Sequence, residues 1–228
     1  MIEAVGTDLT CDVLDLPWRA GSDHAWRSQP EWSRLLAELR SRLAAADIVV
    51  GHSFGASTVL ELLATADELR SLPAVLICPL YWPPGDPVSP PAVDRARAAF
   101  AEHIAAGVRA KLGPRAARTD ADVLDGMIRR AISAVGVMGF QAVLERYIET
   151  RCVPLGQVGG RVVVICAEVD SLLSLRSARA LTSAIPRAEL RSGEYHDHYC
   201  HISQPQPIAD EIIATARQLA QDQAEWAS

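Results

Sequence analysis

The stretch that most constrains this chain is Gly51-His52-Ser53-Phe54-Gly55, which follows directly on the apolar residues 46–50. The β-branched residues before it predict a buried strand, and a helix beginning near Ala56 is predicted by apolar residues at Val59, Leu60, Leu62 and Leu63. A serine in so sharp a strand-to-helix turn has a strained backbone, and the residues two before and two after it must be small. Gly51 and Gly55 meet that need. We expect the Ser53 hydroxyl to project above the sheet edge, within reach of a base and a substrate; an ordinary serine in a tight turn is the alternative.

This stretch resembles the nucleophile elbow of the α/β-hydrolase family, which is often written G-H-S-x-G. The resemblance covers most of the chain from about Cys11 onward. It implies an α/β fold with a mostly parallel, α/β-hydrolase-like sheet flanked by helices and a helical cap insertion. It also implies a serine hydrolase that cleaves an ester or thioester through an acyl-enzyme, without a cofactor.

The remaining elements follow the order of such a fold. Apolar, often β-branched runs predict strands at residues 10–16, 73–78, 161–166 and 188–191. Apolar residues spaced three and four apart predict helices at residues 31–43, at 174–185 and from Pro207. Between the second and third strands, a proline-rich loop leads into three helical patterns with no strand among them. We therefore predict a core of residues 1–79 and 158–228 and a helical cap of residues 80–157.

A serine becomes a nucleophile when a histidine accepts its proton and an acid orients that histidine. In the family order the acid follows the serine, in a loop after a later strand. Asp170 lies about four residues past the strand at 161–166, as the family's acid does. Glu168, nearer the strand, is the alternative acid, and an N-cap of the next helix is the alternative role for Asp170.

The base comes from His196, His198 or His201. The family's histidine commonly stands several residues before a proline that precedes the final helix. Matching residues 202–205 to that interval assigns the base to His198, with His201 and His196 as alternatives. Three histidines so close also raise the possibility of a metal site, but no carboxylate or thiolate set completes one, so we predict no metal.

Three other histidines receive no catalytic role. His52, inside the elbow, is expected to be a packed or hydrogen-bonded neighbour of the site. His24 and His103 are isolated in the sequence, and pocket lining is the most that we assign to them.

The oxyanion hole is the incomplete part of the resemblance. One donor is the backbone N–H of Phe54, and the other normally comes from a His-Gly loop after an early strand, for which residues 1–9 offer no candidate. In the family that strand lies beside the nucleophile strand. We therefore expect a gap of two strand spacings, ~9–10 Å, between residues 11–16 and residues 47–50. We also expect Met1 to be an internal start within a longer gene, and the 228-residue chain to be aggregation-prone and nearly inactive.

The missing donor also leaves other functions open. One is a catalytically impaired binding protein with a hydrolase fold, or an N-terminally truncated fragment. Another keeps the same three residues but performs acyl transfer or carbon–carbon bond hydrolysis, which resemblance of fold does not separate from ester hydrolysis.

Composition restricts the partners. The net charge of −6 argues against nucleic acid and anionic membranes. No apolar run approaches the roughly 18 residues of a membrane span, no signal peptide is recognisable, and five scattered cysteines favour a cytoplasmic location. We expect a small-molecule substrate, an apolar acyl ester or thioester; the oligomeric state stays open. Candidates for lining its pocket are the cap residues Trp82, Phe100, Met138, Phe140 and Tyr147.

Overall fold

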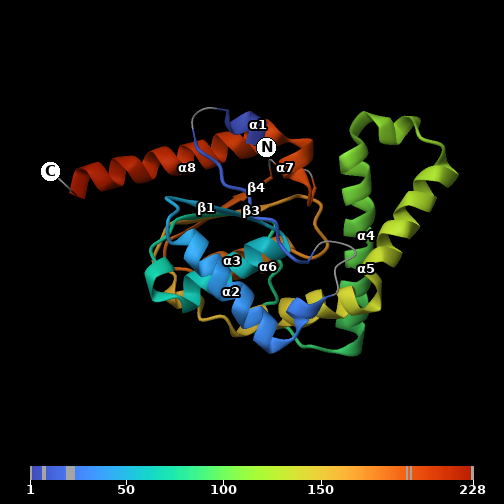
Figure 1. The fold of residues 1–228 in the computed structure, drawn as a ribbon, viewed down its shortest axis with the longest axis horizontal. Helices are drawn as coiled ribbons and strands as arrows, with labels where there is room; N and C mark the ends of the chain where they lie inside the picture. Colours follow the sequence, from blue (N-terminus) through green and yellow to red (C-terminus); the bar gives the residue numbers. More distant parts are fainter. Residues whose placement is uncertain (1, 7–8, 19–23, 194, 196, 227–228) are drawn as a thin grey trace.

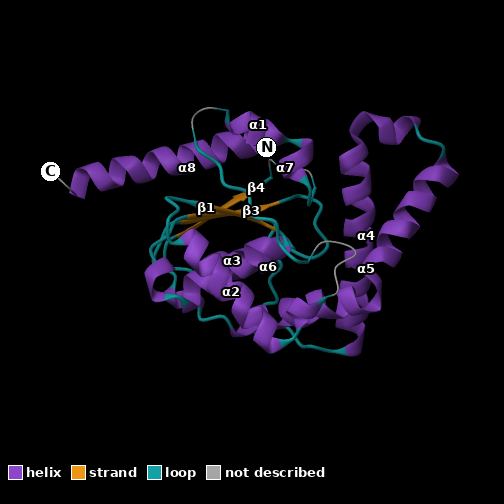
Figure 2. Ribbon diagram, viewed as in Figure 1, coloured by secondary structure: helices purple, strands orange, loops and turns teal. Residues whose placement is uncertain are grey.

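The computed structural model describes residues 2–6, 9–18, 24–193, 195 and 197–226. Their strands form one four-stranded parallel sheet in the order β1-β2-β3-β4 (Figure 2). The strands are β1 (Val49–His52), β2 (Ala74–Ile77), β3 (Val162–Cys166) and β4 (Ala188–Ser192). All four match predicted strands apart from small differences at the ends.

The two central strands are buried along their whole length because their side chains are apolar on both faces. Their register aligns Ile77 of β2 with His52 of β1 and with Ile165 of β3. The carboxyl ends of the strands therefore lie together along one edge of the sheet. The loops that follow β1, β2 and β3 leave the sheet at that edge.

Helices cover both faces of the sheet (Figure 1). One face carries α2 (Gln29–Leu43), α3 (Phe54–Thr65) and α6 (Leu175–Ala184), which pack with Leu76 and Val164 in the larger core cluster. The other face carries α1 (Ile2–Val5) and α8 (Pro205–Trp226), and there Ile208 and Ile212 pack on Val75 and Val163.

The cap is an arm beside the carboxyl edge of the sheet, made of α4 (Pro90–Leu112) and α5 (Ala121–Glu149) (Figure 1). The 3₁₀ segment η3 (Gly113–Arg118) joins them. Gly136 has φ 63° and ψ −177°, which interrupts the helical geometry inside α5. The three predicted helical patterns are therefore present, while the boundaries at 80 and 157 stay a prediction.

Short segments connect these elements. They are the 3₁₀ helices η1 (Ala25–Arg27), η2 (Asp67–Leu69), η4 (Thr150–Cys152) and η5 (Leu155–Gln157), and the one-turn helix α7 (Cys200–Ser203).

The predicted strand at residues 10–16 is wrong. This segment is irregular, with Leu9 packed on the α8 side of the sheet and Leu14 and Leu16 packed on the α2 side. Its alternation of apolar and acidic residues serves that packing, while Val13 is 66% exposed. In the described part of the chain β1 is an edge strand, and no gap between two strands arises because the segment pairs with neither edge.

One helix also departs from the sequence analysis. Residues Ala121–Cys152 are long and apolar enough to cross a membrane by length and composition. The sequence analysis predicts no membrane span because the uncharged run in this helix, residues 131–144, is bounded by Arg130 and Glu145 and is shorter than the roughly 18 residues of a span. The end of the helix nearest the core is tied to it, since Arg27 binds Glu145 and Tyr147 donates to the Leu172 carbonyl. We therefore treat α5 as a cap helix.

Candidate active site

Ser53 occupies the turn between β1 and α3. Its backbone has φ 54° and ψ −122°, a strained conformation for a residue with a side chain, and its N–H donates to the Ile77 carbonyl at 2.9 Å. A Cβ on Gly51 would lie 2.6 Å from the Cα of Ala56, so glycine is required there. A Cβ on Gly55 would meet nothing nearer than the Trp18 ring at 3.9 Å among the described atoms. Glycine is therefore not required at 55, and the added Cβ would already be in van der Waals contact with Trp18 and Leu16.

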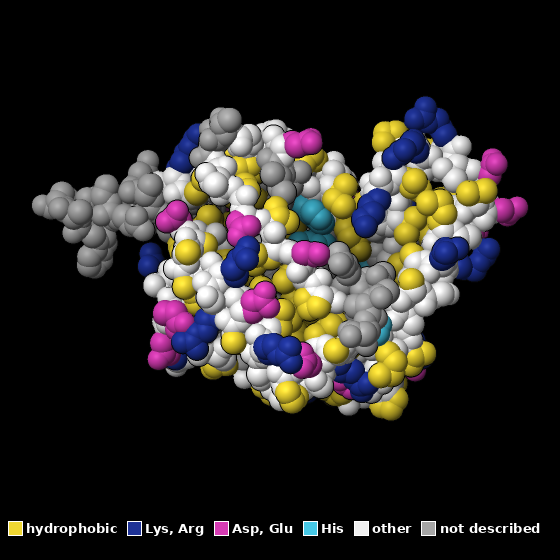
Figure 3. Space-filling view, viewed as in Figure 1, with side chains coloured by type: hydrophobic (Ala, Val, Ile, Leu, Met, Phe, Trp, Pro, Cys, Tyr) yellow, Lys and Arg dark blue, Asp and Glu magenta, His cyan; other side chains and the backbone are white. Residues whose placement is uncertain are grey.

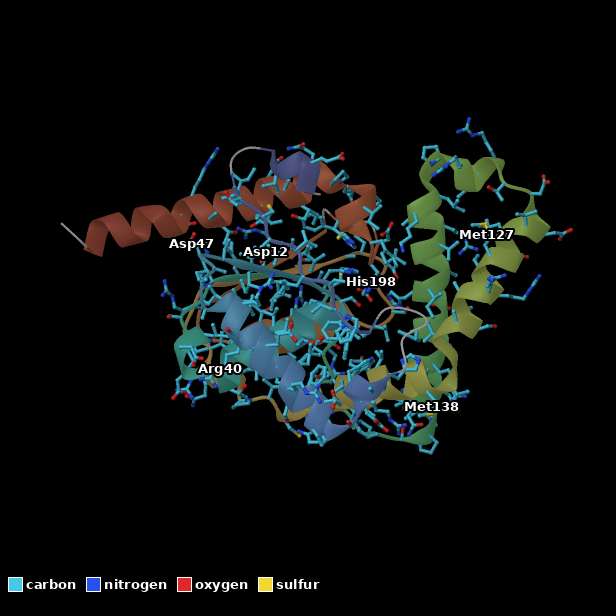
Figure 4. The ribbon with its side chains drawn as sticks, viewed as in Figure 1. Asp12, Arg40, Asp47, Met127, Met138 and His198 are labelled. Atoms are coloured by element: carbon cyan, nitrogen blue, oxygen red, sulfur yellow. The ribbon has the colours of Figure 1, made fainter. Side chains whose placement is uncertain are left out.

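His198 reaches Ser53 from the loop after β4. Its Nε2 lies 2.9 Å from Ser53 Oγ, and its Nδ1 lies 2.8 Å from Asp170 Oδ2. A carboxylate only accepts hydrogen bonds, so Nδ1 carries the hydrogen and the Nε2 lone pair faces the serine hydroxyl. Both distances lie within the ~2.6–3.2 Å over which a general base forms its hydrogen bonds. His198 lies at the end of the sheet that faces the cap helices (Figure 4).

Backbone pairing brings the acid and the histidine together. Beyond the ends of β3 and β4, an isolated parallel bridge joins Val169 to Asp197, and the Glu168 N–H donates to the Tyr195 carbonyl at 2.7 Å. The next residues along the two segments are Asp170 and His198. The exposed Glu168 carboxylate is not the partner of His198, so the structure brings Asp170 rather than Glu168 to the site.

Both carboxylate oxygens of Asp170 have hydrogen-bond donors. Its Oδ1 accepts from the N–H groups of Leu172 and Leu173 at 2.9 and 3.0 Å and faces Nε2 of His103 at 3.1 Å. Burial alone would raise the pKa of this fully buried carboxyl, but the bonds with His103 and His198 outweigh burial and lower the pKa far below its ordinary value. The N-cap of α6 is Ser174, so the alternative role for Asp170 is wrong.

The neighbouring histidines hold the loop that carries His198. His52 donates from Nε2 to the His198 carbonyl at 2.8 Å, which confirms it as a hydrogen-bonded neighbour. The ring of His201 lies 4.0 Å from that of His52, not beside Ser53, and burial lowers the pKa of His201 to about 4. His196 lies outside the described residues. Histidine side chains reach the surface where the cap arm meets the core (Figure 3).

Burial also changes the pKa of the candidate base, His198. It lowers the pKa of His198 below the ordinary 6.5, and the hydrogen bond with Asp170 opposes that change. His198 is therefore neutral at pH 7, which is the state that a general base needs.

His103 is the site residue that sequence reasoning missed. The predicted apolar face of this helix contains Val93, Ala96, Phe100, Ile104 and Val108. The buried face consists of Ala96, Ala99, His103 and Gly107, so Ala96 alone is common to both. Small residues form that face because α4 approaches the loops closely. The available signal was the repeat of small residues at three- and four-residue spacing around one histidine.

The start of α3 adjoins the nucleophile. Phe54 is its first residue, so its N–H lacks a partner within the helix and adjoins Ser53. The Phe54 ring packs against aromatic side chains, with the Trp18 ring centroid at 4.8 Å and that of Trp26 at 5.5 Å. An apolar wall therefore stands beside the nucleophile.

A possible set of metal ligands in the described chain overlaps this site. Cys78, Asp170 and His198 bring ligand atoms within 4.8 Å of one another. The Cys200 thiol and burial raise the pKa of the Cys78 thiol well above its ordinary value, so Cys78 is protonated. A thiol is a poor ligand compared with a thiolate, and the other two groups already bind each other. We assign no metal here.

A parallel sheet with helices on both faces, and a serine turn at its carboxyl edge, is the arrangement of an α/β hydrolase. The sequence profile of the alpha/beta hydrolase family matches residues 2–211, and the chain belongs to that family. No curated protein sequence matches it significantly.

Solved structures agree with this fold. An esterase from Exiguobacterium antarcticum superposes with a TM-score of 0.63 at 12% identity, covering 86% of this chain and 76% of that one. A serine hydrolase from Cycloclasticus zankles superposes with a TM-score of 0.58 at 17% identity, covering 90% of this chain and 75% of that one. A hydrolase from Oleispira antarctica superposes with a TM-score of 0.55 at 15% identity, covering 89% of this chain and 80% of that one. Family and fold together define a hydrolase.

Proposed function

We propose that this protein is a serine hydrolase that cleaves an ester or thioester of a small apolar acyl group through an acyl-enzyme. Ser53 is the nucleophile, His198 the general base and Asp170 the acid that orients it. The observation that carries this proposal is the hydrogen-bonded chain from Ser53 Oγ through the His198 ring to Asp170 Oδ2.

The geometry supports the following steps. Ser53 Oγ attacks the carbonyl carbon while its proton passes to His198 Nε2, and the carbonyl oxygen takes the negative charge next to the Phe54 N–H. The imidazolium is stabilised by Asp170, whose ionised state is favoured by its four donors. His198 then protonates the leaving alcohol or thiol, which frees the acyl-enzyme. Water, deprotonated by the same Nε2, attacks the acyl carbon and releases the acid and Ser53.

The apolar wall beside the nucleophile supports an apolar acyl group. Trp18, Trp26 and Trp32 surround Phe54, and Leu80 and Leu172 belong to the same cluster. Two pairs of cap aromatics serve the cap's own packing: Phe100 lies 5.7 Å from Phe140, and Trp82 lies 5.1 Å from Tyr147, between ring centroids. The apolar wall beside the nucleophile therefore makes p-nitrophenyl acetate, butyrate and octanoate and their thioesters the test substrates.

The decisive experiment is labelling with a fluorophosphonate. The wild-type protein should be labelled and should hydrolyse p-nitrophenyl butyrate, and Ser53→Ala should lose both activities. Ser71→Ala, which changes an exposed serine remote from the turn, serves as the matched control. Labelling that survives Ser53→Ala refutes the nucleophile assignment.

A binding protein with a hydrolase fold is the second candidate. It is favoured by the position of β1, which in the described part of the chain pairs with β2 alone, so the usual neighbouring strand and its oxyanion loop are not among the described elements. Loss of one oxyanion donor typically costs ~10²–10³ in turnover. A folded wild-type protein that is neither labelled nor active on any of these substrates would favour this second candidate.

A further inference from the structure

Helix α4 of the cap lies directly against the loops that carry the proposed acid and base. Its buried face presents His103 and, one turn later, Gly107. A Cβ on Gly107 would lie 2.7 Å from Tyr199 Oη, so the helix touches the residue that follows His198. His103 is i+4 from Ala99 and reaches the acid. One face of one helix therefore contacts both loops.

Both ring nitrogens of His103 face acceptors. Nδ1 lies 2.6 Å from the Ala99 carbonyl oxygen, and Nε2 lies 3.1 Å from Asp170 Oδ1. A neutral imidazole has one N–H and can serve one of these oxygens, whereas an imidazolium donates to both. The side chain is 8% exposed and that of Asp170 is 0% exposed, so water does not replace either partner. The geometry is that of a buried imidazole whose Nε2 faces a buried carboxylate.

Both cap helices touch the loop that carries the acid. Besides His103, Tyr147 of α5 donates from its hydroxyl to the Leu172 carbonyl at 3.1 Å. Ser171 of the loop donates to Glu102 of α4 at 3.3 Å. Three consecutive loop residues, 170–172, are therefore each bound by a cap side chain. Movement of α4 away from the core would remove the His103 donor from Asp170 Oδ1 and leave the Leu172 and Leu173 N–H groups as its donors.

We propose that His103 is a positioning residue that couples the cap to the proposed triad: it holds Asp170 by Oδ1 so that Oδ2 faces His198, and it does so only while α4 is docked. This inference rests on the proposed function. It assigns the cap a second role beside enclosing the substrate, because the orientation of the acid depends on the cap's position.

His103 also acts on His198 through charge. The two rings meet edge to face with centroids 4.0 Å apart, and the electrostatic interaction with His103 lowers the pKa of His198. Loss of that interaction should raise the pKa of His198. The titratable groups that face His198 or influence its neighbours are His103, Asp170, Asp197, His52, His201, Cys78 and Tyr199.

Two neutral substitutions separate the hydrogen bond from the charge. In His103→Gln the amide can still donate to Asp170 Oδ1, whereas the shorter side chain in His103→Asn falls short of it. Both remove the His103 interaction that lowers the pKa of His198, so the acid limb of the pH profile of kcat/KM should move to higher pH in both. Only His103→Asn should also lose about 10- to 100-fold in limiting kcat/KM, the effect of losing a hydrogen bond to a charged group. His103→Gln should stay within about 3-fold, and the exposed Arg95→Gln on α4 should match the wild type.

A spectroscopic measurement tests the same point without turnover. The proton between His198 Nδ1 and Asp170 should give a low-field NMR resonance in the resting protein, retained in His103→Gln and lost or broadened in His103→Asn. Equal limiting rates and equal resonances in the two variants would overturn the inference, and so would equal losses in both. Because the resonance needs no substrate, failure of the Ser53 assignment leaves this test readable.

Discussion

Acid should destabilise this protein through His201, whose ring the fold largely buries. Its Nδ1 is buried and has no hydrogen-bond partner among the described residues, its ring lies 4.0 Å from that of His52, and burial lowers its pKa from 6.5 to about 4. On acidification the unfolded chain therefore binds a proton at this residue before the folded chain does. By linkage the free energy of unfolding is fully retained above pH 6.5 and falls as the pH drops toward 4.

The magnitude follows from the pKa values. A pKa of about 4 in the folded state against 6.5 in the unfolded state corresponds to about 3 kcal/mol of unfolding free energy lost by pH 4. That is a large part of the ~5–15 kcal/mol typical of a whole domain. Neighbouring His52 adds in the same direction, because burial and the charge of His201 lower its pKa well below 6.5.

The assay is urea unfolding followed by tryptophan fluorescence at pH 7.5, 6, 5 and 4. His201→Gln removes the titrating group and should stay within about 1 kcal/mol of the wild type at pH 7.5. Between pH 7.5 and 4 the wild type should lose about 3 kcal/mol more than the variant. The exposed Ser203→Ala, on the same short helix, should follow the wild type. Parallel curves for the wild type and His201→Gln would show that His201 is not a buried neutral group and refute the reasoning.

Two further predictions concern the turn and the base. Gly51→Ala forces a Cβ to within 2.6 Å of the Ala56 Cα, so thermal denaturation should show that the free energy of unfolding falls by about 1–3 kcal/mol or more. Gly55→Ala, inside α3, should leave that free energy unchanged or raise it slightly. Equal effects of the two substitutions would contradict the steric argument. Because burial lowers the pKa of His198, the acid limb of the pH profile of kcat/KM should have its midpoint below pH 6.5, and activity should be full at pH 7. A midpoint above pH 6.5 in the wild type would show that the hydrogen bond with Asp170 affects the pKa of His198 more than burial does.

The sequence was sufficient to predict those elements that depend on local periodicity. The strands β1 to β4 and the helices α2, α3 and α6 lie close to their predicted positions because apolar spacing determines which face a segment buries. The segment at residues 10–16 has a strand-like pattern but forms no strand. A strand exists only with a hydrogen-bonded partner, and a partner is a tertiary property.

The same division applies to the site. The order of Ser53, Asp170 and His198 along the chain could be predicted because parallel strands end at a common edge, and the bridge from Val169 to Asp197 extends that pairing to the loops. The choice between Asp170 and Glu168 was made from loop length, and it is packing that buries one carboxylate and exposes the other.

By itself the sequence determined the fold class and the nucleophile turn, because each depends on short-range pattern. The family resemblance favoured Ser53, Asp170 and His198 and left Glu168, His196 and His201 as alternatives. Only the tertiary structure decided that His103, 67 residues from Asp170 and on a cap helix, binds the other oxygen of the acid. That contact depends on how the α4–α5 arm is oriented against the core. Orientation is set by close packing of small residues such as Gly107 against Tyr199, and no periodicity in the sequence specifies it.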